Sequence, residues 1–321
     1  MKLININSYA RLQDYSFTTE NWQELMHNPP PTGLIYVDHR LIPNFFEMCK
    51  HTDNRYAVLS QLGDFTICEN NKSHLVETLV NLYTVGRDDI VKYIRDNEVI
   101  ENIVITNRYF RDLYNPTDKY MLKLSTNVIG TFNHDIPENV VAWCGTNIDL
   151  NHPKILHLPF GVNYPWPDDC ILKKPIEESK DIKNKDENVY INFSNNTYER
   201  ILLKDIYRLK WRFDVEENLD HDLHMLYLRR NAFALCPIGE GLDCYRTYEA
   251  LFMNSIPVLQ RRNWCQWMED IGLPVILVDD LTKLTIDSLQ EKRKTLNMDW
   301  NRELISEEYW QNRILKTKEL L

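Results

Sequence analysis

Residues 233–258 read Phe233-Ala-Leu-Cys-Pro-Ile-Gly-Glu-Gly-Leu-Asp-Cys-Tyr-Arg-Thr-Tyr-Glu-Ala-Leu-Phe-Met-Asn-Ser-Ile-Pro-Val258. The pattern predicts a short apolar strand, a loop that contains glycine, an amphipathic helix and a second apolar strand. Two strands joined through a helix form a βαβ unit, in which the strands lie parallel. This stretch therefore predicts an α/β fold built around a parallel sheet.

The helix of this unit carries charged residues that suit a nucleotide. Arg246 and Glu249 are three residues apart, so their side chains leave the same face of the helix. A helix N-terminus behind a loop with Gly239 and Gly241 offers backbone N–H groups and a positive dipole end, which suit a diphosphate. Arginine adds a planar cation for phosphate oxygens, and a glutamate accepts hydrogen bonds from ribose hydroxyls. The alternative is a generic βαβ unit with turn glycines and a surface ion pair.

The order of these residues carries a family resemblance. The motif Pro237-x-Gly-x-Gly-x-Asp243-x-x-Arg246-x-x-Glu249-Ala-Leu, followed by Ser255-Ile-Pro-Val258, resembles the carboxy-terminal signature of exostosin-like glycosyltransferases and their soluble viral and bacterial relatives. The resemblance is strong over residues 188–259 and weaker over 141–167. It implies a GT-B architecture of two doubly wound, Rossmann-like domains that face a cleft, with the donor held mainly by the second. It also implies a C-terminal helix that crosses back to the first domain.

Length and composition agree with two globular domains. A chain of 321 residues exceeds a typical single domain, and residues 165–187 are rich in Pro, Lys, Asp and Glu, as a solvated linker is. We therefore predict an acceptor-side domain at 1–165, a linker at 166–187 and a donor-binding domain at 188–321. Predicted strands lie at 33–37 (the first parallel strand, after an irregular start), 56–60, 102–106, 140–144, 189–193, 211–215 and 275–278. Predicted helices lie at 22–26, 43–50, 73–97, 221–230 and 303–321.

Charge, cysteine content and hydropathy restrict where such a protein acts. The formal net charge of −10 argues against a broad, non-specific grip on nucleic acid. Seven cysteines without a CxxC pair indicate reduced thiols in a cytosol. No stretch approaches 18 apolar residues and the start turns polar too soon for a signal sequence, so we expect a cytoplasmic protein without a membrane span. Few glycines and many asparagines hint at a viral or AT-rich source, and a viral protein would act in the cytoplasm of an infected host cell.

A departing nucleoside diphosphate needs positive charge. The acidic pairs Asp88-Asp89, Asp168-Asp169 and Asp279-Asp280 do not form an Asp-x-Asp metal motif, and such pairs are usually solvated. We therefore predict catalysis without a metal and without a cofactor beyond the nucleotide-sugar substrate, with Arg246 as the chief cation.

Other residues near the signature are candidates for the donor site. Arg200 is the second cation, at a helix start beside the 194–197 loop, and the alternative is a helix-surface arginine. Ser194 and Asn195 either bind phosphate or cap that helix. Asp243 and Tyr245 flank the pocket, with helix capping as the alternative for Asp243.

The resemblance suggests that the anomeric centre is inverted, which requires a base from the first domain. Asp64 is the preferred base because it follows a predicted strand at the carboxyl edge of the sheet. His39, which follows the first predicted strand, is the competitor because imidazole transfers protons near neutral pH. Each residue has the alternative of a loop position without a role.

The leading hypothesis is a hexosyl- or pentosyltransferase that moves a sugar from a nucleotide donor, most plausibly a UDP-sugar, to an acceptor hydroxyl. Two acceptor classes stay open: a glycan, and a hydroxymethylated base of phage DNA. A basic strip at Arg108, Arg111, Lys119 and Lys123 would support DNA. The alternative of another class is a non-catalytic protein that binds a nucleotide sugar or glycan. A nicotinamide dehydrogenase is excluded, because no early strand is followed by a G-x-G-x-x-G loop.

Overall fold

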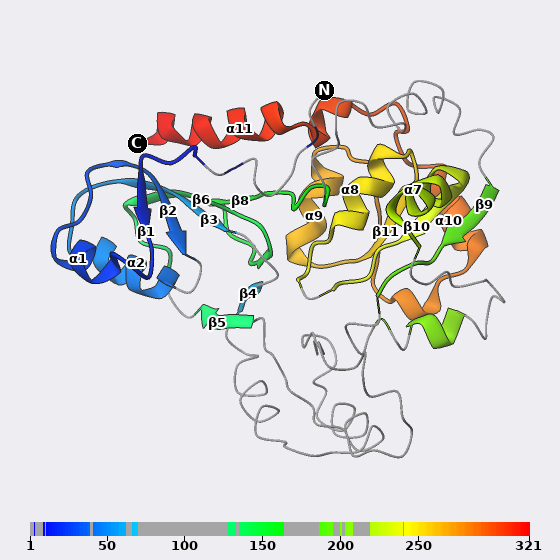
Figure 1. Cartoon of the computed structure of the whole chain (residues 1–321), viewed down its shortest axis with the longest axis horizontal. Helices are drawn as coiled ribbons and strands as arrows, with labels where there is room; N and C mark the ends of the chain where they lie inside the picture. Colours follow the sequence, from blue (N-terminus) through cyan, green and yellow to red (C-terminus); the bar gives the residue numbers. More distant parts are fainter. Residues whose placement is uncertain are drawn as a thin grey trace, which may run out of the picture.

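A computed structural model provides the fold (Figure 1). It describes residues 3, 9, 11–38, 41–61, 66–69, 128–132, 135–163, 186–194, 200, 203–207, 219–239 and 241–321. The predicted strands at 102–106 and 211–215, the helix at 73–97 and all but the last two residues of the linker lie outside these ranges. The predicted domain boundary therefore stays a prediction, and we refer below to an N-terminal half (residues 3–163) and a C-terminal half (residues 186–321).

The N-terminal half is built on a five-stranded parallel sheet. Its order is β1 (Tyr15–Phe17), β2 (Gly33–Asp38), β3 (Tyr56–Gln61), β6 (Val140–Gly145) and β8 (Ile155–His157). Helices α1 (Trp22–His27) and α2 (Ile42–Cys49) belong to the same half. Along β2 the side chains alternate, because Ile35 and Val37 pack on Phe45 of α2 whereas Leu34 belongs to a cluster on the opposite face.

The prediction that β2 is the first strand is wrong. Strand β1 precedes it and pairs with it in parallel, Tyr15 opposite Ile35 and Phe17 opposite Val37. A strand of three residues carries too little alternation to be recognised in a sequence, and its pairing with β2 defines it. A small second sheet of this half contains β5 (Val128–Phe132), β4 (Thr66–Glu69) and β7 (Ile148–Asp149), also parallel.

The C-terminal half contains a four-stranded parallel sheet. Its order is β9 (Asp186–Tyr190), β10 (Asn231–Leu235), β11 (Ile256–Gln260) and β12 (Ile276–Val278). On one face Ala234 packs with α7 (His221–Arg230), α8 (Tyr245–Phe252) and α9 (Asn263–Asp270); on the other, Phe233 packs with Leu203 and with Leu289 of α10 (Ile286–Arg293). Helices therefore cover both faces, as the doubly wound class requires. Strand β9 ends at Tyr190, so the predicted bounds of 189–193 are displaced by three residues.

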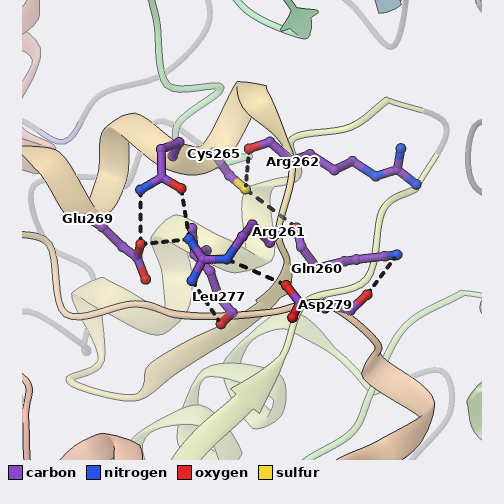
Figure 2. Close-up of polar contacts among 8 residues, drawn as sticks. Gln260, Arg261, Arg262, Cys265, Glu269, Leu277 and Asp279 are labelled. Carbon is purple, nitrogen blue, oxygen red and sulfur yellow. Dashed lines mark hydrogen bonds and ion pairs between the residues drawn. The ribbon is translucent and has the colours of Figure 1, made fainter. Parts of the chain in front are cut away.

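Figure 2 shows how α9 is attached to the ends of β11 and β12. Arg261, directly after β11, donates from Nη1 to Glu269 Oε2 of α9 at 3.1 Å, and its Nε lies 3.7 Å from Asp279 Oδ1 beyond β12. The Cys265 thiol donates to the carbonyls of Gln260 and Arg262 at 3.4 and 3.3 Å. These partly exposed contacts fix the register of helix and strands more than they stabilise the fold.

The chain ends on the N-terminal half. The predicted helix at 303–321 is divided into η7 (Arg302–Ile305), α11 (Glu307–Lys316), capped by the Ser306 hydroxyl, and η8 (Thr317–Leu320). Trp310 and Ile314 of α11 are fully buried in a cluster with Leu34, Leu59 and Cys144 of the first sheet. Figure 1 shows α11 running along the first sheet. Two parallel α/β sheets and a returning C-terminal helix agree with the GT-B architecture that the resemblance implies.

Two further expectations concern the described part of the chain. None of its helices is long and apolar enough to cross a membrane. Its five cysteines are free thiols: Cys49, Cys144, Cys236, Cys244 and Cys265. Burial raises the pKa of Cys49, Cys144 and Cys265 to about 12, so these thiols stay protonated and unreactive at neutral pH.

Candidate functional site

A cavity of about 410 Å³ opens beyond the carboxyl end of β9, against the first turns of α7 and α8. This is the edge of a parallel α/β sheet at which ligands collect. The cavity is lined by Asn163, Asn192, Ser194, Arg200, Leu219, His221, His224, Cys244, Tyr245, Arg246 and Glu249. It therefore contains five of the residues that the sequence proposed for the donor, and Asn163 reaches it from the N-terminal half.

The helix of the signature presents its charged face to this cavity. α8 begins after Cys244, which is extended (φ −141°, ψ 151°) and provides no side-chain cap. Arg246 and Glu249 both line the cavity, as their spacing predicts. The Arg246 Nε is buried and has no hydrogen-bond partner within the described part of the chain. Because an unsatisfied buried donor is unfavourable, this arginine is arranged for a partner that binds from the cavity.

Arg200 is held by the loop between β10 and α8. Its Nε donates to Ile238 O at 2.8 Å and its Nη2 to Pro237 O at 3.1 Å, while Nη1 donates to Ser194 Oγ at 3.2 Å. Arg200 is 5% exposed, so it does not lie on a helix surface. A Cβ on Gly239 would lie 2.6 Å from Arg200 Nη2, so this glycine makes room for the guanidinium. The Gly239 N–H donates to Gly241 O at 2.9 Å, which closes the loop.

Three cations surround one aromatic ring behind the cavity. The guanidinium carbons of Arg200 and Arg246 lie 5.8 and 5.7 Å from the centre of the Phe193 ring, and the Lys204 Nζ lies 5.5 Å from it. Arg200, Lys204 and Phe193 are buried. Cation–π attraction offsets only part of the mutual repulsion of such charges. Two of these cations, Arg200 and Arg246, also line the cavity, and their positive charge favours an anionic ligand there.

Glu249 is an ionised, buried acceptor in the wall of the cavity. Its Oε2 lies 3.1 Å from His224 Nε2 and its Oε1 lies 3.7 Å from His221 Nε2. Burial acts to raise the pKa of Glu249, but hydrogen bonding by His221 and His224 and the positive charges of His224 and Arg246 lower it to about 2. In return, hydrogen bonding to Glu249 raises the pKa of His221. A carboxylate with one histidine at each oxygen still has lone pairs for hydroxyl groups of a ligand.

The two histidines of α7 were not predicted as site residues. His221 and His224 are three residues apart after the N-cap Asp220, so both leave one face of α7. This spacing could have marked the two histidines as a shared helix face in the sequence. It does not show that this face lies against α8, which depends on the packing of the two helices.

Asp243 has a different place from the one predicted. It does not line the cavity, and Cys244 rather than Asp243 is the N-cap of α8. The buried Asp243 carboxylate accepts from Phe160 N at 2.9 Å and from Tyr248 Oη, and the Asp243 N–H donates to Asn147 Oδ1 at 2.7 Å. Asp243 therefore connects α8 to the N-terminal half. Burial raises its pKa to about 7.

Of the remaining candidates, Tyr245 lies at the cavity. Tyr245 lines the cavity and its ring lies 4.6 Å from that of Phe160. Asn195 and both candidate bases, Asp64 and His39, lie outside the described residues, as do Asp88-Asp89 and Asp168-Asp169.

The third acidic pair, Asp279-Asp280, is solvated or structural. Asp279 is exposed and pairs with Arg261, while Asp280 accepts from Thr282 N at 2.9 Å and pairs with Lys283 at 2.9 Å. The described residues contain no group of three or more His, Cys, Asp and Glu side chains placed for a metal ion.

Comparison with solved structures finds bacterial sugar-phosphate synthases. A structure titled "Trehalose-6-phosphate from E. coli bound with UDP-2-fluoro glucose" has 12% sequence identity and a TM-score of 0.33, over 93% of this chain and 74% of that one. The alpha,alpha-trehalose 6-phosphate synthase of Burkholderia multivorans has the same identity and TM-score, over 92% of this chain and 70% of that one.

The match to a family model lies in the C-terminal half of the chain. The chain is 27% identical over 88 residues to ribitol-5-phosphate xylosyltransferase 1 of Danio rerio, a match that spans 22% of this chain and 20% of the relative. Residues 184–305 match the family model of the RXYLT1 C-terminal domain, and this segment supplies every lining residue of the cavity except Asn163.

Proposed function

We propose that this protein is a glycosyltransferase that takes a sugar from a nucleotide donor, a UDP-sugar, and transfers it to an acceptor hydroxyl. The unsatisfied, buried Nε of Arg246 in the wall of the cavity carries the proposal, since it calls for an anionic ligand. The match of residues 184–305 to the RXYLT1 C-terminal domain supports the class of reaction. The resemblance to exostosin-like enzymes and the viral or bacterial source stay predictions.

The donor diphosphate binds to Arg246 at the N-terminal turn of α8. Arg246 contributes a fixed cation, and the uncapped helix N-terminus contributes backbone N–H groups. Arg200 supports the same region by holding the Pro237–Gly239 loop in place. The carboxylate of Glu249, on the same helix face, accepts from the vicinal hydroxyls of the ribose.

In the transfer itself, charge builds up on the departing diphosphate as the bond to the sugar breaks. A cation already in position stabilises that charge without reorganisation, which is commonly the largest catalytic contribution. We propose that Arg246 provides this stabilisation without a metal, and that the reaction inverts the anomeric centre. The base comes from the N-terminal half, with Asp64 preferred over His39.

The acceptor is proposed by class only. A glycan hydroxyl and a hydroxymethylated DNA base both remain candidates, and the basic strip that would support DNA lies outside the described residues. The name of the zebrafish relative adds ribitol 5-phosphate as an acceptor and xylose as a sugar to test.

Isothermal titration calorimetry with UDP, UDP-xylose and UDP-glucose tests the donor site. Arg246→Ala should weaken UDP binding by about 10- to 100-fold, the usual range for a lost hydrogen bond to a charged group. The matched control is Arg230→Ala, since Arg230 is exposed at the end of α7 and does not line the cavity. Equal affinity of both variants would contradict the assignment of Arg246, and absence of binding by the wild type would contradict the donor site.

A turnover assay separates the enzyme from a binding protein. Release of UDP from UDP-xylose and UDP-glucose is measured with ribitol 5-phosphate, an oligosaccharide mixture and hydroxymethylated DNA as acceptors. Acceptor-dependent release is expected with one of the three. Tight binding of the donor without release under any of these conditions would favour the alternative, a non-catalytic nucleotide-sugar-binding protein.

A further inference from the structure

A chain of polar contacts leads from β9 through α7 to Glu249. Asn192 Nδ2 lies 2.8 Å from Tyr190 Oη, and Tyr190 Oη lies 2.9 Å from His224 Nδ1. His224 Nε2 then lies 3.1 Å from Glu249 Oε2. Tyr190, His224 and Glu249 are all buried, so these distances are those of hydrogen bonds shielded from water.

The donors at the two ends of this chain of contacts follow from what each group can donate. Glu249 is ionised and accepts only, so the proton between it and His224 belongs to Nε2. At the other end, the Asn192 amide nitrogen donates only, so it uses a lone pair of the Tyr190 hydroxyl. The Tyr190 hydroxyl is left with one lone pair and one proton for its hydrogen bond with His224 Nδ1. Both ring nitrogens of His224 are therefore engaged, with Nε2–H donating to Glu249 and Nδ1 held by Tyr190.

We propose that His224, held at Nδ1 by Tyr190 and, through it, by Asn192, is a positioning residue that aims the Glu249 carboxylate at the ribose diol of the donor. The inference rests on the proposed function, because it specifies how that donor site recognises ribose. The Nε2–H of His224 occupies one lone pair of Glu249 Oε2 and so orients the carboxylate, and the remaining lone pairs accept from both hydroxyls of a diol. Selection of ribonucleotides over 2′-deoxyribonucleotides is therefore determined by His224 through Glu249.

The test is the ratio of the dissociation constants of each 2′-deoxyribonucleoside diphosphate and its ribonucleoside counterpart, measured by calorimetry for the bases U, C, A and G. The wild type should prefer the ribonucleotide of its cognate base by about 10- to 100-fold, because a hydrogen bond to a charged group is lost in the deoxy form. Two variants of His224 differ only in how far their side-chain amide nitrogen extends from the backbone. The amide nitrogen of His224→Gln replaces Nε2, whereas that of His224→Asn reaches only the position of Nδ1.

We expect His224→Gln to keep most of the ribose preference and His224→Asn to reduce it about tenfold. His51→Asn is the matched control, since His51 is exposed beyond α2. An equal ribose preference in the Gln and Asn variants would overturn the proposal, because a purely structural role does not depend on the position of the side-chain amide nitrogen. A wild type that binds UDP without ribose preference would overturn it too and leave the donor site intact, whereas no nucleotide binding at all would contradict the proposed function itself.

A second pair of variants keeps the histidine in place. Tyr190→Phe removes the hydroxyl that holds Nδ1, and we expect a several-fold loss of ribose preference. Tyr227→Phe is its control, because the Tyr227 ring stacks on Tyr190 at 5.8 Å and loses the same atom. An equal effect of the two substitutions would contradict the role of the Tyr190 hydroxyl.

Discussion

Replacing Asp243 with asparagine tests the junction between α8 and the N-terminal half. Burial raises the pKa of Asp243 to about 7, against an ordinary value of 3.8. Between these two values the folded protein holds a proton that the unfolded chain has released. The stabilising contribution of this proton is therefore full below the unfolded pKa and is lost as pH rises through the folded pKa.

The size of the effect follows from the two pKa values. One pKa unit corresponds to about 1.4 kcal/mol, so a shift of about 3 units gives about 3 kcal/mol between pH 5 and pH 8. An asparagine at this position does not titrate. The difference in free energy of unfolding, wild type minus Asp243→Asn, should therefore fall by about 3 kcal/mol over that range. Hydrogen bonds altered by the amide add an offset that does not depend on pH.

Urea denaturation followed by tryptophan fluorescence measures this difference at pH 5, 6, 7 and 8. Asp53→Asn is the control, because Asp53 lies in an exposed loop and its replacement should leave the pH profile unchanged. A wild type minus Asp243→Asn difference that stays constant from pH 5 to pH 8 would refute the reasoning. That result would mean that the hydrogen bonds from Phe160 N, Tyr248 Oη and Cys244 N to the carboxylate outweigh its burial.

Three further predictions concern other parts of the molecule. Burial lowers the pKa of His157 to about 4, so the stability of the protein should fall as pH drops below the unfolded value of 6.5. His157→Gln should remove about 2 kcal/mol of that loss between pH 7 and pH 5, as measured by urea denaturation. An unchanged pH profile in this variant would count against the prediction. Trp310→Ala should destabilise the protein by about 3 to 5 kcal/mol, seen in the urea midpoint, because the fully buried indole also donates to Leu304 O; a loss below about 1 kcal/mol would show that α11 is dispensable. Gly239→Ala should displace the Arg200 guanidinium and weaken UDP binding about tenfold in calorimetry, and unchanged affinity would refute the steric role of this glycine.

The fold was predictable where local signals are strong. Strand β10, helix α8 and strand β11 lie within the stretch that was interpreted first, because apolar runs and a glycine loop mark their ends. The predicted bounds of strand β9 were displaced because Ile191 and Phe193, which follow the strand, are as apolar as the strand itself. The end of β9 is set by the pairing of Tyr190 with Ala234. Pairing over such separations is not encoded in a local pattern.

The candidate site shows the same division between local and distant information. Arg246 and Glu249 were found because a helix spacing places them together. Asp243 was misplaced because its partners Phe160 and Asn147 are 83 and 96 residues away along the chain. An aspartate just before a helix is compatible with a pocket residue and with a helix cap. Only the packing of the two halves shows that Asp243 instead connects them.

Net charge and local charge point in opposite directions in this protein. The whole chain carries −10, yet Arg200, Lys204 and Arg246 gather within 6 Å of one ring beside the cavity. Surface charges farther away than about 8 Å are largely screened at physiological salt, whereas buried charges are not. A small diphosphate inside the cavity therefore experiences the three cations, while an extended polyanion would also meet the acidic surface. The opposition favours a compact anionic ligand at this site, and it means that binding of UDP should weaken far less with added salt than binding of DNA.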